Sequence, residues 1–299
     1  MSMAVTVLMS TYNGERYLRE QIESIIAQEK VDVKLIVRDD GSEDGTTAIL
    51  DDYQAKGVLS WYTGKNLRPA KSFMHLLFNS PDSDFYAFSD QDDVWDSDKL
   101  NSAIDCISKA KVPALYCSDT LLVDANLGLI RQAGIQAECT FVESLISNPV
   151  TGCTMVFNKA LRDIVLHFQP NVIDMHDWWI YRICMAVDGF FYFDSNPHIK
   201  YRQHENNVIG GQGSKWNRIK RRIGYFFHGL DGIRYLMSVE LYKGYSSIIP
   251  LHNKLILEKF VNYKKSILDT ITLATSSEIV LKNKTILHTF KKAVLLRKY

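Results

Sequence analysis

The sequence has few cysteines and no long apolar run, and each shortage excludes a class of protein. Its five cysteines include no close pair and leave an odd one over, which argues against a disulfide scaffold and a zinc motif: Cys106, Cys117, Cys139, Cys153 and Cys184. No segment approaches the ~20 uninterrupted apolar residues of a membrane-spanning helix. The apolar run from Ala4 to Met9 is too short for a signal peptide and lacks a basic flank. We therefore expect a globular chain in a reducing cytoplasm.

The near absence of net charge hides two regions of opposite sign. The whole chain has a formal net charge of +1. Residues 213–299 carry 17 Lys and Arg against 5 Asp and Glu, and residues 1–212 carry 18 against 29. An acidic body with a basic tail indicates two tasks. We expect a catalytic domain over 1–212 and a basic helical region over 213–299, with a hinge at the glycines of 210–213.

The first two-thirds of the chain alternates strand and helix patterns, which predicts an α/β fold with a mostly parallel central sheet flanked by helices. The expected strands are short apolar runs: Val5–Met9, Val33–Val37, Leu59–Tyr62, Phe85–Phe88, Ala114–Cys117, Thr154–Phe157 and Phe190–Phe193. The expected helices are amphipathic: about Glu15–Gln28, Thr46–Lys56, Ser72–Phe78, Ser97–Lys109, Asp177–Val187, Leu251–Leu273 and Glu278–Leu296. Ligands of such sheets bind beyond the carboxyl ends of the strands.

Three polar clusters follow expected strands, and the richest is Ser89-Asp-Gln-Asp-Asp-Val-Trp95. Its carboxylates, Asp90, Asp92 and Asp93, would repel one another unless a cation sits among them. Mg²⁺ or Mn²⁺ prefers such oxygen ligands and is often shared with substrate phosphates. An EF-hand loop is excluded, because Trp95 and Asn101 stand where Gly and Glu are required. A structural turn remains the alternative on spacing alone, and we expect Asp98 to cap the next helix.

Six motifs occur in an order that resembles family 2 glycosyltransferases, and most closely the bacterial rhamnosyltransferases of cell-wall and capsular polysaccharide synthesis. They are Ser10-Thr-Tyr-Asn-Gly14, Arg38-Asp-Asp-Gly-Ser-Glu-Asp-Gly-Thr46, Ser89-Asp-Gln-Asp-Asp-Val-Trp95, Thr151-Gly152, His176-Asp-Trp178 and Tyr201-Arg-Gln-His-Glu-Asn-Asn-Val208. The resemblance covers about residues 4–212. It implies a GT-A fold, a nucleotide-sugar donor, a divalent metal and inversion at the anomeric carbon.

The resemblance also implies roles for individual residues. The nucleotide or donor would contact Thr11, Tyr12, Asn13, Asp39, Lys71, Asp90 and Gln91, with Asp39 accepting the base N3–H and Asp90 near the ribose or sugar. Asp92 and His204 would ligate Mn²⁺ or Mg²⁺, and Asp177 would be the general base. Asp93, Arg202 and Trp178 would support the site.

Several of these residues have structural alternatives. Asp177 opens an expected helix, where Asp is common as an N-cap. A single histidine such as His204 is more often a hydrogen-bonded surface residue than a ligand. Trp178, with its neighbours Trp179 and Tyr181, fits either a hydrophobic core or an aromatic wall for a sugar ring.

Two features depart from familiar patterns. Arg68 and Ser72 stand where the nearest relatives tend to have Gly and Asn, which leaves the loop shape and the donor sugar open. Gln212-Gly-Ser-Lys-Trp216 approaches the QxxRW pattern of processive polymerases, but Lys replaces Arg and no transmembrane helix is expected. We interpret the chain as adding one sugar per encounter.

The basic tail contains an amphipathic helix pattern over Lys215–Leu230 with apolar residues on one face. Such a helix fits the surface of an anionic membrane, and packing on the catalytic domain is the alternative. Nucleic-acid binding is disfavoured because the chain contains no known binding module. The last expected helices could form a hairpin or a homodimer contact.

The resemblance, together with the basic tail, implies an inverting, metal-dependent transferase on the cytoplasmic face of the cell membrane. It would move L-rhamnose from dTDP-β-L-rhamnose to a hydroxyl of a lipid-linked saccharide. A UDP-hexose donor is the first alternative, since uracil and thymine share the N3–H. An inactive nucleotide-sugar-binding subunit is the second. A haloacid-dehalogenase-like phosphatase fits poorly, because its nucleophile follows the first strand.

Overall fold

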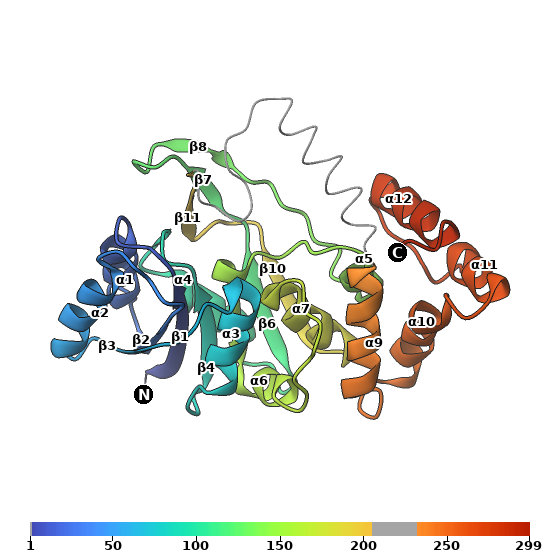
Figure 1. Cartoon of the computed structure of the whole chain (residues 1–299), viewed down its shortest axis with the longest axis horizontal. Coiled ribbons are helices and arrows are strands. Elements are labelled where there is room, and N and C mark those ends of the chain that lie inside the picture. Colours follow the sequence, from blue (N-terminus) through green and yellow to red (C-terminus); the bar gives the residue numbers. More distant parts are fainter. Residues whose placement is uncertain (1, 205–231) are drawn as a thin grey trace.

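A mostly parallel sheet forms the centre of the molecule (Figure 1). The computed structural model describes residues 2–204 and 232–299. In these ranges seven strands pair in the order β10-β6-β9-β4-β1-β2-β3. Their bounds are β1 Met3–Thr11, β2 Val31–Asp39, β3 Leu59–Thr63, β4 Phe85–Ser89, β6 Ala114–Ser118, β9 Val156–Asn158 and β10 Phe190–Asp194. Strand β9 is antiparallel to both of its neighbours, and the other pairs are parallel. The predicted α/β architecture is confirmed.

Alternating side chains of the central strands enter two hydrophobic cores, one on each face of the sheet. In β4, Phe85 and Ala87 belong to one cluster and Tyr86 and Phe88 to the other. Both faces are covered by helices, so the strand is apolar throughout, as parallel strands usually are. The helices within the first part of the chain are α1 Leu18–Ile26, α2 Thr46–Ala55, α3 Arg68–Phe78, α4 Lys99–Ile107, α5 Phe141–Ile146, α6 Lys159–Val165 and α7 His176–Ala186, with a 3-10 turn η1 at Gly152–Thr154.

A second, four-stranded sheet was not predicted. Its order is β5-β11-β7-β8, and its strands are β5 Val94–Trp95, β7 Leu121–Val123, β8 Leu129–Gln132 and β11 Ile199–Arg202. These strands are only two to four residues long, which is too short for a periodicity to be recognised in the sequence. The sheet is relevant to the predicted metal site because Asp92 precedes β5 and His204 follows β11.

Four helices follow the undescribed segment: α9 Ile233–Tyr245, α10 Leu251–Asn262, α11 Ile267–Thr275 and α12 Lys284–Leu295. The predicted single helix over Leu251–Leu273 is wrong, because Ser266 begins a new helix by accepting a hydrogen bond from the Asp269 N–H at 3.0 Å. The helix predicted from Glu278 begins only after Asn283, which caps it. Asp98 makes no side-chain cap of α4; its carboxylate faces Ser102 and His198 instead.

The C-terminal helices share a core with the α/β layer. Met237 and Leu241 of α9 belong to the same hydrophobic cluster as Trp179 of α7. Arg182 of α7, fully buried, donates hydrogen bonds to the carbonyls of Ser144, Leu145 and Arg234. The amphipathic helix predicted over Lys215–Leu230 lies outside the described residues, and the boundary at 212/213 stays a prediction. Across the described ranges, every helix is too short or too polar to cross a bilayer.

Candidate active site

The carboxyl ends of β1, β2 and β4 meet at one edge of the central sheet, as predicted. Thr11 pairs in register with Asp39, and Met9 with Ser89. The three polar clusters that follow these strands therefore lie side by side. This edge holds most of the residues that the sequence singled out.

Asp39 is fully buried at this edge. Its carboxylate accepts hydrogen bonds from the Thr11 hydroxyl at 3.0 Å and the Ser42 hydroxyl at 2.5 Å. It also accepts from the backbone N–H groups of Gly41 at 3.0 Å and Ser42 at 2.8 Å. The Thr63 hydroxyl donates a fifth, longer bond at 3.4 Å. Because Asp39 is 0% exposed, a nucleobase N–H would have to replace one of these five bonds. The predicted base contact stays a prediction.

Tyr12 and Gln91 join the loops after β1 and β4. The Gln91 side chain accepts from the Tyr12 N–H at 2.8 Å and donates to the Tyr12 carbonyl at 3.1 Å. It occupies the space where Gly14 would carry a side chain. Asn13 donates its N–H to Ser42 and so ties the first loop to the second. The Tyr12 ring is 48% exposed beside this network and is free to contact a ligand.

The start of α3 lies beside the carboxyl ends of β1 and β2. Arg38 forms a buried ion pair with Asp40 and donates to the Ser72 hydroxyl at 3.0 Å. Ser72 also shares a hydrogen bond of 2.7 Å with Ser10 of β1. Lys71, one residue earlier, is exposed in the first turn of α3. Lys71 is therefore accessible, and its predicted contact with the donor stays a prediction.

Arg68 adopts a backbone conformation that favours glycine. Its φ is +64°, in the left-handed region, where a side chain costs about 1 kcal/mol. The resemblance places Gly at this position in relatives. Arg68 in place of Gly introduces strain at the start of α3. Arg68 is exposed, and its N–H donates to the Asn66 side chain at 2.9 Å.

We predict that Arg68→Gly raises the free energy of unfolding by about 1 kcal/mol, because glycine removes this strain. Urea unfolding followed by circular dichroism measures the change. Lys30→Gly is a matched control, since Lys30 is exposed with φ +63° and should show a similar gain. A loss of stability in Arg68→Gly beside a gain in Lys30→Gly would contradict the prediction.

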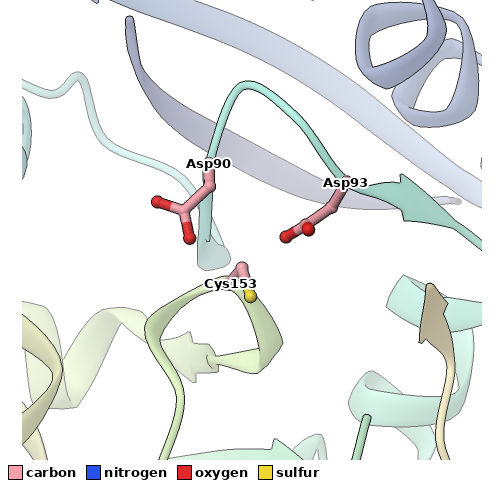
Figure 2. A group of neighbouring side chains, drawn as sticks. All are labelled: Asp90, Asp93 and Cys153. Atoms are coloured by element: carbon pink, nitrogen blue, oxygen red, sulfur yellow. The ribbon is translucent and has the colours of Figure 1, made fainter. Parts of the chain in front are cut away.

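The carboxylate loop between β4 and β5 carries Asp90 at its start and Asp93 at its end. Both lie above Cys153 of η1 (Figure 2), and one ligand atom from each of the three lies within 4.8 Å of the others. Burial, followed by the charges of Asp92 and Asp177, raises the pKa of Asp90 to about 7. Burial and the charges of Asp92 and Asp90 raise the pKa of Asp93 well above its usual value. Both carboxyl groups therefore hold a proton more readily than an exposed aspartate does.

Asp92, between Asp90 and Asp93 in the chain, contacts His204. The Asp92 carboxylate lies 2.7 Å from His204 Nε2, and the two side chains are 17% and 14% exposed. A carboxylate and an imidazole that meet at an accessible position form a donor set that suits a divalent cation sharing its remaining positions with phosphate. The residues present therefore fit the predicted metal. The sequence could not show this contact, because 112 residues separate the two.

Arg202 fixes this side of the loop. Its backbone N–H donates to Asp93 at 3.0 Å, and its guanidinium donates to the Asp92 carbonyl at 2.8 Å. The guanidinium also reaches Glu20 of α1 at 2.5 Å and the carbonyl of Ala125 at 2.6 Å. The arginine therefore connects β11, α1 and the β7–β8 hairpin to the carboxylate loop, and its predicted supporting role stays a prediction.

Asp177 lies in the first turn of α7 and does not cap it, because Met175 occupies the N-cap. Its carboxylate accepts from the Trp178 N–H at 2.5 Å and from the Asn148 side chain at 3.1 Å. Burial raises the pKa of Asp177 to about 6, although the Trp178, Asn148 and Gly152 donors oppose the rise. A carboxylate in this range can accept a proton near neutral pH.

The aromatic residues around Asp177 form core. Trp178 is 2% exposed and Trp179 and Tyr181 are 0% exposed, so none offers a ring face to a sugar. His176 stacks on Phe73 at 4.1 Å between ring centroids, and burial lowers the pKa of His176 to about 3. A neutral imidazole in this place packs beneath Gly152, whose Cβ position would lie 2.6 Å from His176 Nε2.

Sequence reasoning missed Cys153, which lies beside Asp90 and Asp93, and Asn148, which donates to Asp177. No spacing in the sequence signals either contact.

Comparisons with known proteins identify the family of the chain. Residues 6–126 match the model of the family described as glycosyl transferase family 2. Over 234 residues, 71% of this chain and 77% of the relative, the sequence is 31% identical to the dTDP-rhamnosyl transferase RfbG of Shigella flexneri. It is 24% identical over 158 residues to the UDP-Glc:alpha-D-GlcNAc-diphosphoundecaprenol beta-1,3-glucosyltransferase WfgD of Escherichia coli, covering 52% of this chain and 61% of that protein.

A solved structure extends the agreement to the fold. The S. aureus TarS fragment 1–349 in complex with UDP-GlcNAc matches 99% of this chain and 82% of that chain, with a TM-score of 0.61 and 18% identity. The sheet topology, the carboxylate loop at its edge and the similarity to RfbG over most of both chains lead to one conclusion. The chain belongs to glycosyl transferase family 2 and is a glycosyltransferase of the GT-A fold.

Proposed function

We propose that this glycosyltransferase transfers L-rhamnose from dTDP-β-L-rhamnose, with inversion, to a hydroxyl of a lipid-linked saccharide in bacterial cell-surface polysaccharide synthesis. One observation carries the proposal. The charges of Asp92 and Asp177 both raise the pKa of Asp90 after burial, which supports a candidate metal ligand and a candidate base in one site.

Asp177 is the group that we assign to the proton transfer. As the acceptor oxygen bonds to the anomeric carbon, the bond from that carbon to the diphosphate oxygen breaks. The acceptor proton passes to the Asp177 carboxylate, and the nucleoside diphosphate leaves. One displacement needs no covalent enzyme intermediate, so no Ser or Cys nucleophile is required.

Asp92 and His204 are the residues that we assign to Mn²⁺ or Mg²⁺. When bound, such a cation supplies positive charge that stabilises a departing diphosphate. Arg202 holds Asp92 in place through its backbone carbonyl, and Lys71 offers a further positive charge at the edge of the site. Thr11, Tyr12, Asn13, Asp39, Asp90 and Gln91 remain our assignments for the nucleotide and sugar.

The similarity to a dTDP-rhamnosyl transferase supports rhamnose as the donor sugar. A UDP-hexose is the second candidate, and two comparisons favour it: one relative is named for UDP-Glc, and the TarS fragment is in complex with UDP-GlcNAc. The inactive-subunit alternative is disfavoured because Asp92, His204 and Asp177 are all present.

A lipid-linked acceptor is supported by the diphosphoundecaprenol in the name of the WfgD relative. Such an acceptor lies in a membrane, so we propose that the protein works at the cytoplasmic face of the cell membrane without spanning it. The described part of the tail, residues 232–299, carries 12 Lys and Arg against 4 Asp and Glu, which suits an anionic surface. A homodimer contact through these helices is the alternative use of that region.

A donor screen tests the proposal. Isothermal titration with Mn²⁺ present should show tightest binding for dTDP-β-L-rhamnose among that donor, UDP-glucose, UDP-galactose and UDP-GlcNAc. Preference for a UDP-sugar would replace the rhamnose assignment by the second candidate. Equal, weak binding of all four donors would contradict the proposed donor site.

A further inference from the structure

Exposed apolar side chains concentrate in the C-terminal helices. Of the eighteen large hydrophobic residues that are exposed in the described parts of the chain, ten lie in residues 232–299. They are Leu236, Ile248, Leu251, Leu255, Ile267, Leu268, Ile271, Val280, Leu295 and Leu296. A single exposed apolar residue is ordinary on a protein surface, whereas a group of them indicates a surface that binds a partner or a membrane.

The most exposed members of this group lie together on α11. Ile267 and Leu268 are 71% and 76% exposed, and Ile271 is 46% exposed. Because residues four apart in a helix share a face, these three side chains lie with the exposed Thr272 and Thr275 on one side of α11. This side, which we call the α11 face, contains no charged residue.

The other side of α11 is fixed to the protein. Thr270 and Leu273 are 4% and 0% exposed, and the Thr270 hydroxyl donates to the Tyr263 carbonyl at 2.7 Å. Asp269 is the one charged residue of the helix, and its carboxylate accepts a hydrogen bond from the Ser266 hydroxyl at 2.7 Å. The α11 face therefore belongs to a well-anchored helix at one end of the molecule, opposite α2 and β3 (Figure 1).

The part of the chain that carries the α11 face is strongly basic. Residues 251–299 contain 10 Lys and Arg against 3 Asp and Glu. Of these basic residues, Lys259 alone forms an ion pair with a carboxylate in the described ranges, that of Glu278. Lys265 and Lys284, on either side of α11 in the sequence, are both exposed. An uncharged aliphatic face thus occurs in a region whose positive charge is not neutralised within the described chain.

We propose that the α11 face is the surface by which this protein docks on an anionic lipid membrane. Its aliphatic side chains enter the boundary between headgroups and acyl chains, and the surrounding lysines attract the negative headgroups. This inference rests on the membrane location in the proposed function, and it names the side chains that provide the attachment.

Charge decides between a membrane and a second copy of the chain as the occupant of this face. In a symmetric dimer, the same patch of both copies forms the interface. A dimer built on the α11 face would therefore bring two regions of excess positive charge together, and like charges repel. An anionic membrane attracts the same charges.

Co-sedimentation with vesicles of equal parts phosphatidylglycerol and phosphatidylcholine tests the inference. The wild type should bind these vesicles at low salt. Ile267→Ser/Leu268→Ser should bind at least about tenfold more weakly, because burial of one such aliphatic side chain is already worth about a factor of ten. Leu129→Ser/Ile130→Ser is the matched control: these neighbours on β8 are 69% and 44% exposed, and their loss should leave vesicle binding unchanged.

A basic variant separates attraction by charge from insertion. Lys265→Gln/Lys284→Gln should weaken binding to these vesicles at low salt, and its difference from the wild type should vanish at high salt, where the Debye length is short. Ile267→Ser/Leu268→Ser should lose binding at both salt concentrations, because insertion of apolar side chains does not depend on charge.

Three results would overturn the inference. They are a wild type that does not bind these vesicles, unchanged vesicle binding in Ile267→Ser/Leu268→Ser, and a wild-type dimer in analytical ultracentrifugation that this variant converts to a monomer. The last result would assign the α11 face to a second copy. Because both side chains are largely exposed, the variant should keep the urea midpoint of the wild type; Leu268→Ser alone carries the test if the double variant is unstable.

The proposed reaction is judged separately, by calorimetry of dTDP with Mn²⁺ and by transfer assays. The α11 face contains none of the residues assigned to the donor or the metal, so Ile267→Ser/Leu268→Ser should bind dTDP as the wild type does. Vesicle binding without glycosyl transfer would contradict the proposed reaction and leave the α11 face as the membrane surface. Transfer by a wild type that does not bind the vesicles would contradict the α11 assignment alone.

Discussion

Replacing Asp177 by Asn is expected to lower the rate of glycosyl transfer by about 10²- to 10⁴-fold, the usual cost of losing a general base. The amide oxygen of Asn can still accept the hydrogen bonds from the Trp178 N–H and the Asn148 side chain, so the fold should be retained. Donor affinity should stay within a few-fold, because the base acts on the acceptor. Steady-state transfer assays and donor calorimetry measure the two effects separately.

The pH dependence of the wild type gives a second readout of the same group. The pKa of Asp177 is raised to about 6, and the reaction requires its ionised form. The rate should therefore fall as the pH drops through 6. Asp174→Asn is the matched control: it removes a charge that raises the pKa of Asp177, so the fall should move to lower pH while the rate at neutral pH is kept. Near-normal turnover in Asp177→Asn would leave this residue a structural role only.

Asp92→Asn is expected to remove the metal dependence of nucleotide binding. Loss of a residue that only hydrogen-bonds to a metal ligand costs about 10- to 100-fold in affinity for the metal. Loss of the ligand itself should therefore cost at least that much. The effect should appear with Mn²⁺ and vanish with chelator, where the variant and the wild type should bind dTDP equally.

Asp98→Asn is the control for Asp92→Asn. Asp98 is an exposed carboxylate six residues along the chain that faces His198 and Ser102, so its loss should not change the affinity for dTDP. A wild type whose affinity for dTDP is the same with and without chelator would rule out the metal at Asp92.

The sequence predicted the central sheet because its strands are strongly apolar runs. Phe85–Phe88 is buried along its whole length, and the carboxylates that follow it lie where the end of a parallel strand requires. Strands β5 and β11 escaped prediction because they are short and pair across more than 100 residues. The break between α10 and α11 did have a signal, the Ser266-x-x-Asp269 capping pattern, which the apolar periodicity around it obscured.

In the candidate site, too, local features could be predicted and long-range contacts could not. Residues within one motif, such as Asp90, Asp92 and Asp93, could be predicted as a group from their position after a strand. The contacts between motifs could not, because Asp92 meets His204 only when β5 pairs with β11 and carries the two segments together. The family resemblance implied a role for His204, and the fold explains why His204 lies beside Asp92.

Transfer of labelled rhamnose from dTDP-β-L-rhamnose into the lipid-linked saccharides of bacterial membranes tests the central claim most directly. With Mn²⁺, the wild type should move label into the solvent-extracted lipid fraction as an α-linked rhamnose, and Asp177→Asn should not. Label that fails to enter this fraction from dTDP-rhamnose or from any of the three UDP-sugars, or that enters it undiminished with Asp177→Asn, would contradict the account.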